Sequence, residues 1–110
     1  IEQVALNIIN NALDAMINIG RKKILRITTK IGTFEERRMV RVTISDNGSG
    51  IEEKDLVRIF DPFFTSKKHG KGTGLGLSIC YGIIQDHGGK IWAENNPEGG
   101  ADFCFELPVE

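Results

Sequence analysis

Hydrophobic positions recur with helical spacing in two segments of the chain. In residues 1–19, Val4, Ile8 and Ala12 are four positions apart, and other apolar residues occupy most of the remaining circumference. This pattern predicts a helix that is largely buried. Residues 75–87 show a similar period and end at a glycine pair, which predicts a second long helix. Residues 52–60 begin with acidic side chains and precede Pro62, and they predict a short helix.

Four other segments alternate between apolar and polar residues, as half-buried strands do. They are residues 24–31, 39–45, 90–94 and 102–107. Residues 32–37 separate the first pair and residues 95–100 the second, so each pair is predicted to form a hairpin. The predicted fold class is therefore α+β, a two-layer sandwich with a mainly antiparallel sheet and helices on one face.

Composition and charge narrow the class of protein. The chain has 110 residues, which fits one domain spanning residues 1–110, and it is 40% hydrophobic and 26% charged. A net charge of -1 argues against a nucleic-acid or membrane-surface partner. Cys80 and Cys104 lie in apolar runs and are expected to be small buried side chains in a cytoplasmic protein. Because the first helix starts at Ile1 without a capping residue, we expect the chain to be a piece of a longer one.

A polar stripe interrupts the apolar surface of the first predicted helix. Its members follow at i, i+4, i+8, i+11 and i+15, and they are Gln3, Asn7, Asn11, Asp14 and Asn18. Asparagine is a poor helix former, so its recurrence favours a face turned toward a polar ligand or ion. A partly exposed polar edge is the alternative.

A glycine-rich run lies directly before the second long helix. Glycine occupies every second position from Gly70 to Gly76, a spacing that fits neither the dinucleotide fingerprint nor the Walker loop. Glycines let the backbone approach a ligand closely, and a helix start offers unpaired N–H groups to an anion. Lys67, Lys68 and Lys71 add positive charge. The run therefore predicts a triphosphate site, with a flexible loop as the alternative.

The segment from Asp46 to Gly50 follows a predicted strand. Asp-Asn-Gly is good turn chemistry, and a tight turn is the simpler interpretation. As a ligand site, the carboxylate of Asp46 would accept a hydrogen bond from an adenine amino group, and the glycines would let the base lie against the backbone. Farther along, Phe60 and two following phenylalanines surround Pro62, which fits either a core plug or the anchor of a lid.

Four segments, in this order, resemble the boxes of a known family. They are residues 7–12, 46–51, 60–65 and 72–79, which are similar to the N, first glycine, F and second glycine boxes of the catalytic, ATP-binding domain of bacterial sensor histidine kinases. Residues 99–103 resemble a weaker last box, and the similarity is greatest to nitrogen-regulatory sensor kinases. Gyrase, MutL and the heat-shock chaperone share this superfamily. The resemblance covers essentially the whole chain and implies a Bergerat-type sandwich with a mixed sheet.

The resemblance also implies a role for individual residues. Asn11 would bind Mg²⁺ through its side-chain oxygen, and Asn7 would help to hold the phosphates and the ion. Asp46 would accept from the adenine amino group, with Gly48 and Gly50 beside the base. Lys67 would reach the terminal phosphate and, with Asn7, act in catalysis. The implied nucleotide contacts also include Phe60, Lys67, Lys71, Gly72, Thr73, Gly74, Leu75, Gly76 and Leu77.

The chain departs from the family pattern at two positions. Many members carry Lys or Arg where this chain has Asp14, so no phosphate contact is expected there. Many also carry Arg where this chain has Thr65, and Lys67 is expected to supply that charge instead.

The implied activity is that of an ATP-dependent protein-histidine kinase. It would use ATP and Mg²⁺ and pass the γ-phosphoryl group to a histidine on a dimerisation and phosphoacceptor domain upstream. A response regulator would follow in the pathway. The full-length protein is expected to be a homodimer and this piece a monomer. The alternatives are a serine kinase, a nucleotide-sensing module, or an ATP-hydrolysing conformational clamp; the clamp relatives use a Glu base where this chain has Asn7, which cannot take a proton.

Overall fold

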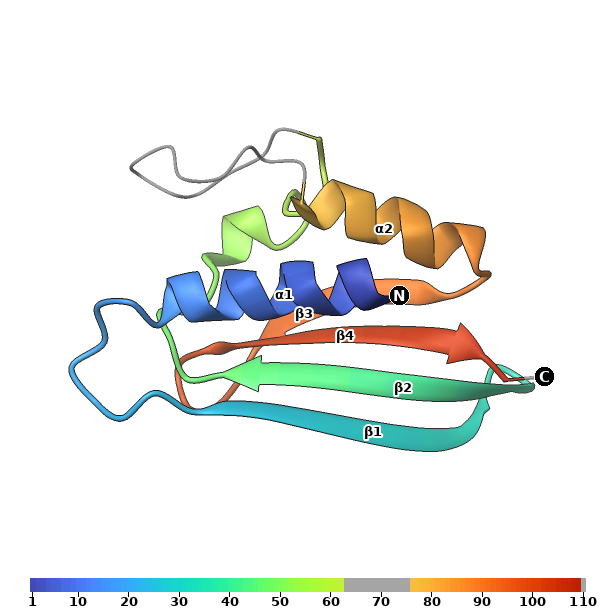
Figure 1. Ribbon diagram of the computed structural model, residues 1–110, viewed down its shortest axis with the longest axis horizontal. Helices are drawn as coiled ribbons and strands as arrows, with labels where there is room; N and C mark the ends of the chain where they lie inside the picture. The colour runs from blue at the N-terminus through green and yellow to red at the C-terminus, as the bar shows by residue number, and fades with distance from the viewer. Residues whose placement is uncertain (63–75, 110) are drawn as a thin grey trace.

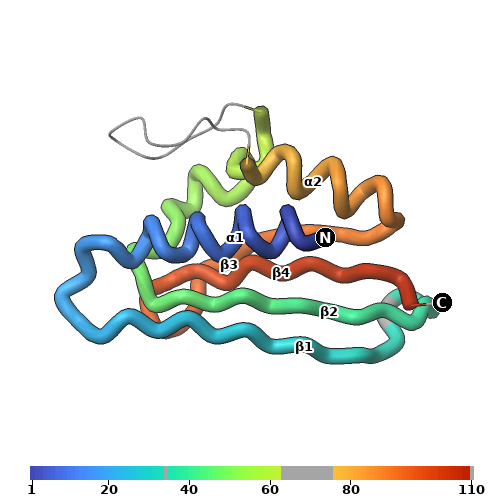
Figure 2. Tube along the Cα trace, in the orientation of Figure 1, coloured from blue at the N-terminus to red at the C-terminus, as the bar shows by residue number. Residues whose placement is uncertain are grey.

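The sheet has four strands, and both long helices lie on one of its faces (Figures 1 and 2). The computed structural model describes residues 1–62 and 76–109, apart from the side chain of Phe34. The elements in chain order are α1 (Glu2–Ala15), β1 (Leu25–Phe34), β2 (Arg37–Asp46), the 3₁₀ helix η1 (Glu53–Asp55), α2 (Gly76–Asp86), β3 (Lys90–Asn95) and β4 (Ala101–Pro108). The strand order is β1-β2-β4-β3, and each neighbouring pair is antiparallel. The predicted two-layer α+β class and antiparallel hairpins are confirmed.

The β1–β2 hairpin is longer than the alternation predicted. Strand pairing continues to Phe34↔Arg37, so the turn consists of Glu35 and Glu36 alone. Both have a positive φ, 53° and 66°, as the tightest antiparallel turns require at both central positions. The expected loop over residues 32–37 was wrong. A left-handed backbone is uncommon for residues other than glycine, asparagine and aspartate, so two glutamates did not indicate a tight turn.

Two of the three predicted helices are shorter than the sequence predicted. α1 ends at Ala15 rather than at residue 19, and the expected helix over residues 52–60 is reduced to η1 followed by turns. α2 matches its prediction closely and ends at Asp86, directly before residues 87–89. Hydrophobic period alone does not mark a helix end, and these ends differ from the prediction by a few residues.

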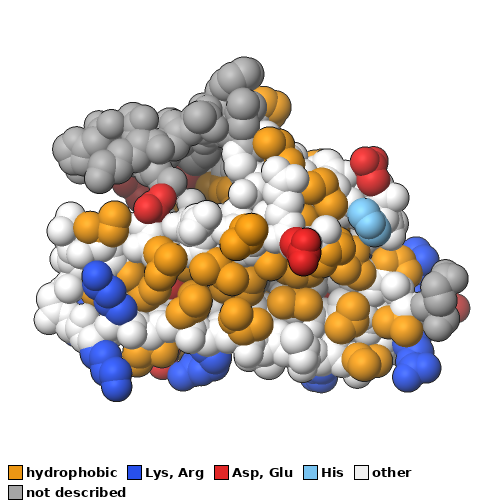
Figure 3. Space-filling view, in the orientation of Figure 1, with side chains coloured by type: hydrophobic (Ala, Val, Ile, Leu, Met, Phe, Trp, Pro, Cys, Tyr) orange, Lys and Arg blue, Asp and Glu red, His pale blue; other side chains and the backbone are white. Residues whose placement is uncertain are grey.

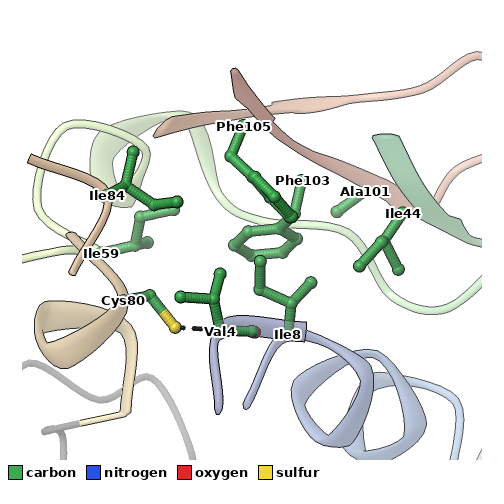
Figure 4. Packing of buried hydrophobic residues seen from close by; sticks show 9 residues of the cluster. All are labelled: Val4, Ile8, Ile44, Ile59, Cys80, Ile84, Ala101, Phe103 and Phe105. Carbon is green, nitrogen blue, oxygen red and sulfur yellow. Dashed lines mark hydrogen bonds between the residues drawn. The ribbon is translucent and has the colours of Figure 1, made fainter. Parts of the chain in front are cut away.

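The core lies between the two helices and the inner face of the sheet (Figure 4). Val4 and Ile8 of α1, and Cys80 and Ile84 of α2, are fully buried. The ring of Phe103 from β4 lies against them and is 1% exposed. Cys80 and Cys104 are both buried free thiols, as predicted.

The expectation that α1 is largely buried was wrong for one side of the helix. Leu6 and Leu13 are 60% and 49% exposed, and Ile17, just beyond the end of α1, is 49% exposed. On the edge strand β1, Ile27 and Ile31 pair with inner-face residues of β2 but remain 53% and 61% exposed. Hydrophobic side chains therefore gather on the surface over α1 and the strands beside it (Figure 3). Two helices are too few to cover four strands, and this side of the sheet is the part they leave open.

Candidate functional site

Three segments far apart in sequence meet at one end of the sandwich. The end of β2, the turn between β3 and β4, and the loop that follows α1 lie together there (Figure 1). Hydrogen bonds join all three: Ser49 N donates to Ala15 O at 3.2 Å, and Ile51 N donates to Asn95 Oδ1 at 2.7 Å. The predicted binding segment, residues 46–50, lies at the centre of this end.

Asp46 is the buried carboxylate at this end, with 3% of its surface exposed. Its Oδ1 accepts from two backbone donors, Gly48 N at 2.9 Å and Ala101 N at 3.2 Å. Its Oδ2 has no hydrogen-bond partner among the described residues. One carboxylate oxygen is thus fixed by the backbone, and the other can accept from a ligand.

The loop after α1 holds the residues that follow Asp46. Asn47 is 6% exposed; its Oδ1 accepts from Ile24 N at 2.9 Å, and its Nδ2 donates to Lys22 O at 2.8 Å. Arg21 donates through Nη2 to the carbonyl oxygen of Asn47. Neither Arg21 nor Asn47 was singled out from the sequence as a site residue.

The two glycines of this segment are required by protein packing. A Cβ on Gly48 would lie 2.4 Å from Ala15 O, far inside contact distance. Gly50 has φ +76°, and a Cβ there would lie 2.7 Å from Gly99 O. Both glycines therefore let other parts of the chain close around Asp46, a reason additional to the base contact that the sequence suggested.

The amide stripe of α1 faces the start of α2. Asn7 Nδ2 donates to Gly76 O at 3.2 Å, and both residues are half-buried. Asn11, one helical turn later on the same face, is half-buried and has no side-chain hydrogen bond within the described residues. Burial raises the pKa of the Cys80 thiol, while a hydrogen bond from the Asn7 side chain lowers it. The structure therefore brings Asn7 to the place where α2 begins, with Asn11 one turn further along the same face of α1.

Phe60 and Leu77, also predicted site residues, pack against the core cluster. The Phe60 ring lies 6.1 Å from that of Tyr81, centroid to centroid, and the two planes are tilted by 37°. Phe60 therefore fixes the chain against the core and α2 shortly before residue 63. The other predicted site residues lie outside the described residues; they are Lys67, Lys71, Gly72, Thr73, Gly74 and Leu75.

Across the described residues, no three His, Cys, Asp or Glu side chains come together as a metal site. His87 is exposed, and its Nδ1 lies 2.8 Å from Ile83 O at the end of α2. Within residues 1–62 and 76–109, no helix has the length and hydrophobicity that a membrane crossing requires.

A separate hollow of about 490 Å³ lies on the outer face of the sheet, away from the helices. Arg41 donates there to the buried carboxylate of Glu106 and lies 5.2 Å from the centre of the Trp92 ring. Lys90 pairs with Glu35 at 2.5 Å and thereby joins the β1–β2 turn to β3. The charges in this hollow are already paired with each other, in contrast to the carboxylate of Asp46.

Comparison with known proteins gives a family match over the whole chain. Residues 1–110 match the family described as histidine kinase-, DNA gyrase B-, and HSP90-like ATPase. The chain is 42% identical over 109 residues to the sensor protein FixL of Bradyrhizobium diazoefficiens, covering 99% of this chain and 20% of that protein. It is 41% identical over 108 residues to sporulation kinase A of Bacillus subtilis, covering 98% and 16%. The chain thus spans about a fifth or less of these relatives.

Solved structures show the same fold. The nucleotide-free catalytic domain of the histidine kinase ThkA is 42% identical, with a TM-score of 0.77 over 96% of this chain and 64% of that one. Full-length ShkA in complex with AMPPNP is 26% identical, with a TM-score of 0.72 over 96% of this chain and 20% of that one. In both comparisons, nearly all of the present chain has a structural counterpart in the solved protein.

Proposed function

Because the chain belongs to the family of histidine kinase-, DNA gyrase B- and HSP90-like ATPases, we propose that it binds ATP with Mg²⁺ and donates the γ-phosphoryl group to a histidine on another domain. The observation that carries the proposal is Asp46: a 3% exposed carboxylate with one oxygen held by two backbone N–H groups and the other without a partner among the described residues. That arrangement suits an acceptor for the amino group of adenine. Comparison with ShkA, which was solved with AMPPNP, supports a nucleotide as the ligand.

The two amides on α1 fit the metal and phosphate end of the same ligand. Asn7 donates through Nδ2 to Gly76 O, so its Oδ1 remains as the atom that would accept from or coordinate the ligand. The side chain of Asn11 remains without a partner among the described residues, and its Oδ1 would coordinate Mg²⁺. Oxygen donors suit this ion, and a bound triphosphate would provide most of the negative charge. When bound, Mg²⁺ would neutralise charge on the phosphates as the γ-phosphoryl group is transferred.

In the proposed reaction a histidine nitrogen bonds to the γ-phosphorus, and the bond from that phosphorus to the β–γ bridging oxygen breaks, leaving ADP. Such transfers depend on positioning and charge neutralisation more than on covalent help from the protein. We assign the first of these to Asp46, Asn7 and Asn11. Lys67 and the backbone N–H groups of residues 72–76 are proposed for the second, along with a supporting contact from Lys71.

The conformational-clamp alternative, which hydrolyses ATP, is less consistent with Asn7. An amide cannot take a proton from water at neutral pH, and this one already donates to Gly76 O. We therefore expect slow hydrolysis in the absence of an acceptor domain. We further propose a cytoplasmic location, a phosphoacceptor domain in the longer protein as first partner, a response regulator as second, and a homodimeric full-length protein.

Calorimetric titration with AMPPNP and Mg²⁺ tests the pocket. Wild-type chain should bind, and Asp46→Ala should lose most of the affinity. Glu98→Ala, an exposed change in the β3–β4 turn, serves as the control. Addition of a histidine-bearing dimerisation domain and labelled ATP then tests the transfer. Acid-labile phosphate on the added domain supports kinase activity, whereas rapid phosphate release with no labelled domain would favour the clamp.

A further inference from the structure

Asn96 organises the turn between β3 and β4. Its Oδ1 accepts from Glu98 N at 3.0 Å and from Gly100 N at 3.1 Å, and its backbone N–H donates to Gly100 O at 2.9 Å. Gly99 N also donates to Asn96 O at 3.1 Å, with φ of Gly99 at +95°. One asparagine therefore fixes the course of the backbone from residue 96 to residue 100.

The same side chain connects this turn to Asp46. Asn96 Nδ2 donates to Asp46 O at 2.9 Å and to Asp102 Oδ1 at 2.9 Å. This holds the start of β4 against the end of β2, where Ala101 N reaches Asp46 Oδ1 at 3.2 Å. Asn96 thus acts on both parts of Asp46: directly on the main chain, and through Ala101 on the carboxylate.

The neighbouring asparagine holds the other end of the binding segment. Asn95 Oδ1 accepts from Ile51 N, and Asn95 Nδ2 donates to Ile51 O, both at 2.7 Å. This pair of bonds imitates one step of strand pairing and places Gly50 beside Gly99. Together the two asparagines fix residue 46 and residue 51, at the two ends of the segment, residues 46–50, that is proposed to hold the base.

We propose that Asn96 is a positioning residue of the nucleotide site, which sets the direction of the second Asp46 carboxylate oxygen, Oδ2, before the nucleotide binds. Asn95 assists by fixing Ile51. The inference rests on the proposed function, because it takes Asp46 Oδ2 as the acceptor for the purine amino group. Its chemical consequence is selectivity: a correctly directed carboxylate favours an amino group at that position and disfavours a carbonyl oxygen.

The test compares two nucleotides on matched variants. Mg²⁺-dependent binding of ATP and of inosine triphosphate, which has a carbonyl in place of the amino group, is measured by calorimetry or by competition. Asn96→Ala removes every side-chain bond of this residue. Asn96→Asp keeps the acceptor that closes the turn and loses the donor to Asp46 O. Glu98→Ala alters the same turn at an exposed side chain and is the control. Circular dichroism establishes that each variant is folded.

We expect both Asn96 variants to weaken ATP binding about tenfold and to lower the ratio by which the protein prefers ATP to inosine triphosphate. Glu98→Ala should leave both values unchanged. Unchanged ATP affinity in Asn96→Asp would overturn the inference, and so would an equal loss of affinity for the two nucleotides, since that would mean that Asn96 only supports the fold. Failure of the wild-type chain to bind ATP would instead refute the proposed function.

Discussion

Gly100 offers a sharp test of how closely the chain packs around Asp46. A Cβ at this buried position would lie 2.1 Å from Asp46 O and 2.6 Å from Asp46 Oδ1. The φ angle of Gly100 is outside the left-handed region, so alanine would meet a steric conflict and no conformational one. The nearest atom belongs to the backbone of β2, which cannot move aside as a flexible side chain can. Gly100→Ala must therefore separate β2 from the start of β4.

Forcing extra volume into a packed interior typically costs ~1–3 kcal/mol of unfolding free energy. Because the conflict at Gly100 is with backbone, we expect a loss near the upper end of that range. Gly82 gives the matched control: it lies exposed in the middle of α2, and a Cβ there would contact nothing within 4 Å. Gly82→Ala should gain about 0.5–1 kcal/mol from helix propensity. The same chemical change should therefore have opposite signs at the two sites.

Urea unfolding of the two variants and of wild type measures both effects, and thermal unfolding should show a change of roughly 4–8 °C in Tm per kcal/mol. AMPPNP affinity should fall in Gly100→Ala, because Asp46 is displaced, and stay at the wild-type value in Gly82→Ala. A neutral or stabilising Gly100→Ala would mean that β4 does not approach Asp46 as described. If Gly100→Ala is destabilised but keeps full affinity for AMPPNP, the close packing of β4 against Asp46 does not contribute to nucleotide binding.

Three further changes test the core, the thiols and the outer face. Phe103→Ala should cost about 3–5 kcal/mol in urea unfolding, since its ring is 1% exposed among both helices and the sheet; a loss below about 1 kcal/mol would contradict this packing. Burial raises the pKa of the Cys80 and Cys104 thiols above the ordinary 9.0, so the unfolded chain should lose these protons first. Unfolding free energy should then fall as pH rises above about 9, and serine at both positions should flatten that fall in urea titrations across this range. Arg41→Ala should destabilise by about 1–3 kcal/mol because it leaves the buried Glu106 carboxylate without this partner, and Arg41→Ala combined with Glu106→Ala should cost less than the sum of the single changes.

The elements of the fold were predictable because their hydrophobic periods are strong. Both long helices and all four strands appear where the sequence predicted them, with ends shifted by a few residues. The β1–β2 turn was not predictable, because it places Glu35 and Glu36 in a conformation that usually requires Gly, Asn or Asp. Long-range strand pairing determined this turn, and local preference did not.

The extent of burial on α1 was also beyond the sequence pattern. Leu6 and Leu13 are as hydrophobic as Ile8, yet they are exposed while Ile8 is buried. Which side of an almost wholly apolar helix is covered depends on where the sheet and α2 lie, and no residue within the helix specifies that. The apolar period predicted the helix, and tertiary packing chose the buried face.

Within the site, the residue that binds was easier to predict than the residues that hold it. Asp46 and the two following glycines also suit a tight turn, but the resemblance of residues 46–51 to the first glycine box pointed to Asp46 as a binding residue. Arg21, Asn47, Asn95 and Asn96 act through backbone atoms of other segments, and such contacts leave no motif in the sequence. The Asn95-Asn96 pair did give a local signal, because asparagine in a turn often bonds to nearby backbone. It did not indicate that these side chains would also reach Asp46 and Ile51.

The amide stripe left two interpretations open in the sequence, and the structure gives a physical argument that bears on them. A polar edge would have placed every amide of the stripe in solvent, as is the case for Gln3 and for Asn18, which lies beyond the end of α1. Instead, Asn7 bonds across to Gly76 O, and Asn11 lies half-buried one turn further along, with its side chain unused by the described residues. A half-buried amide without a partner costs free energy unless a ligand or water completes its hydrogen bonds. The centre of the stripe therefore favours a ligand-facing role, and its ends are simply exposed.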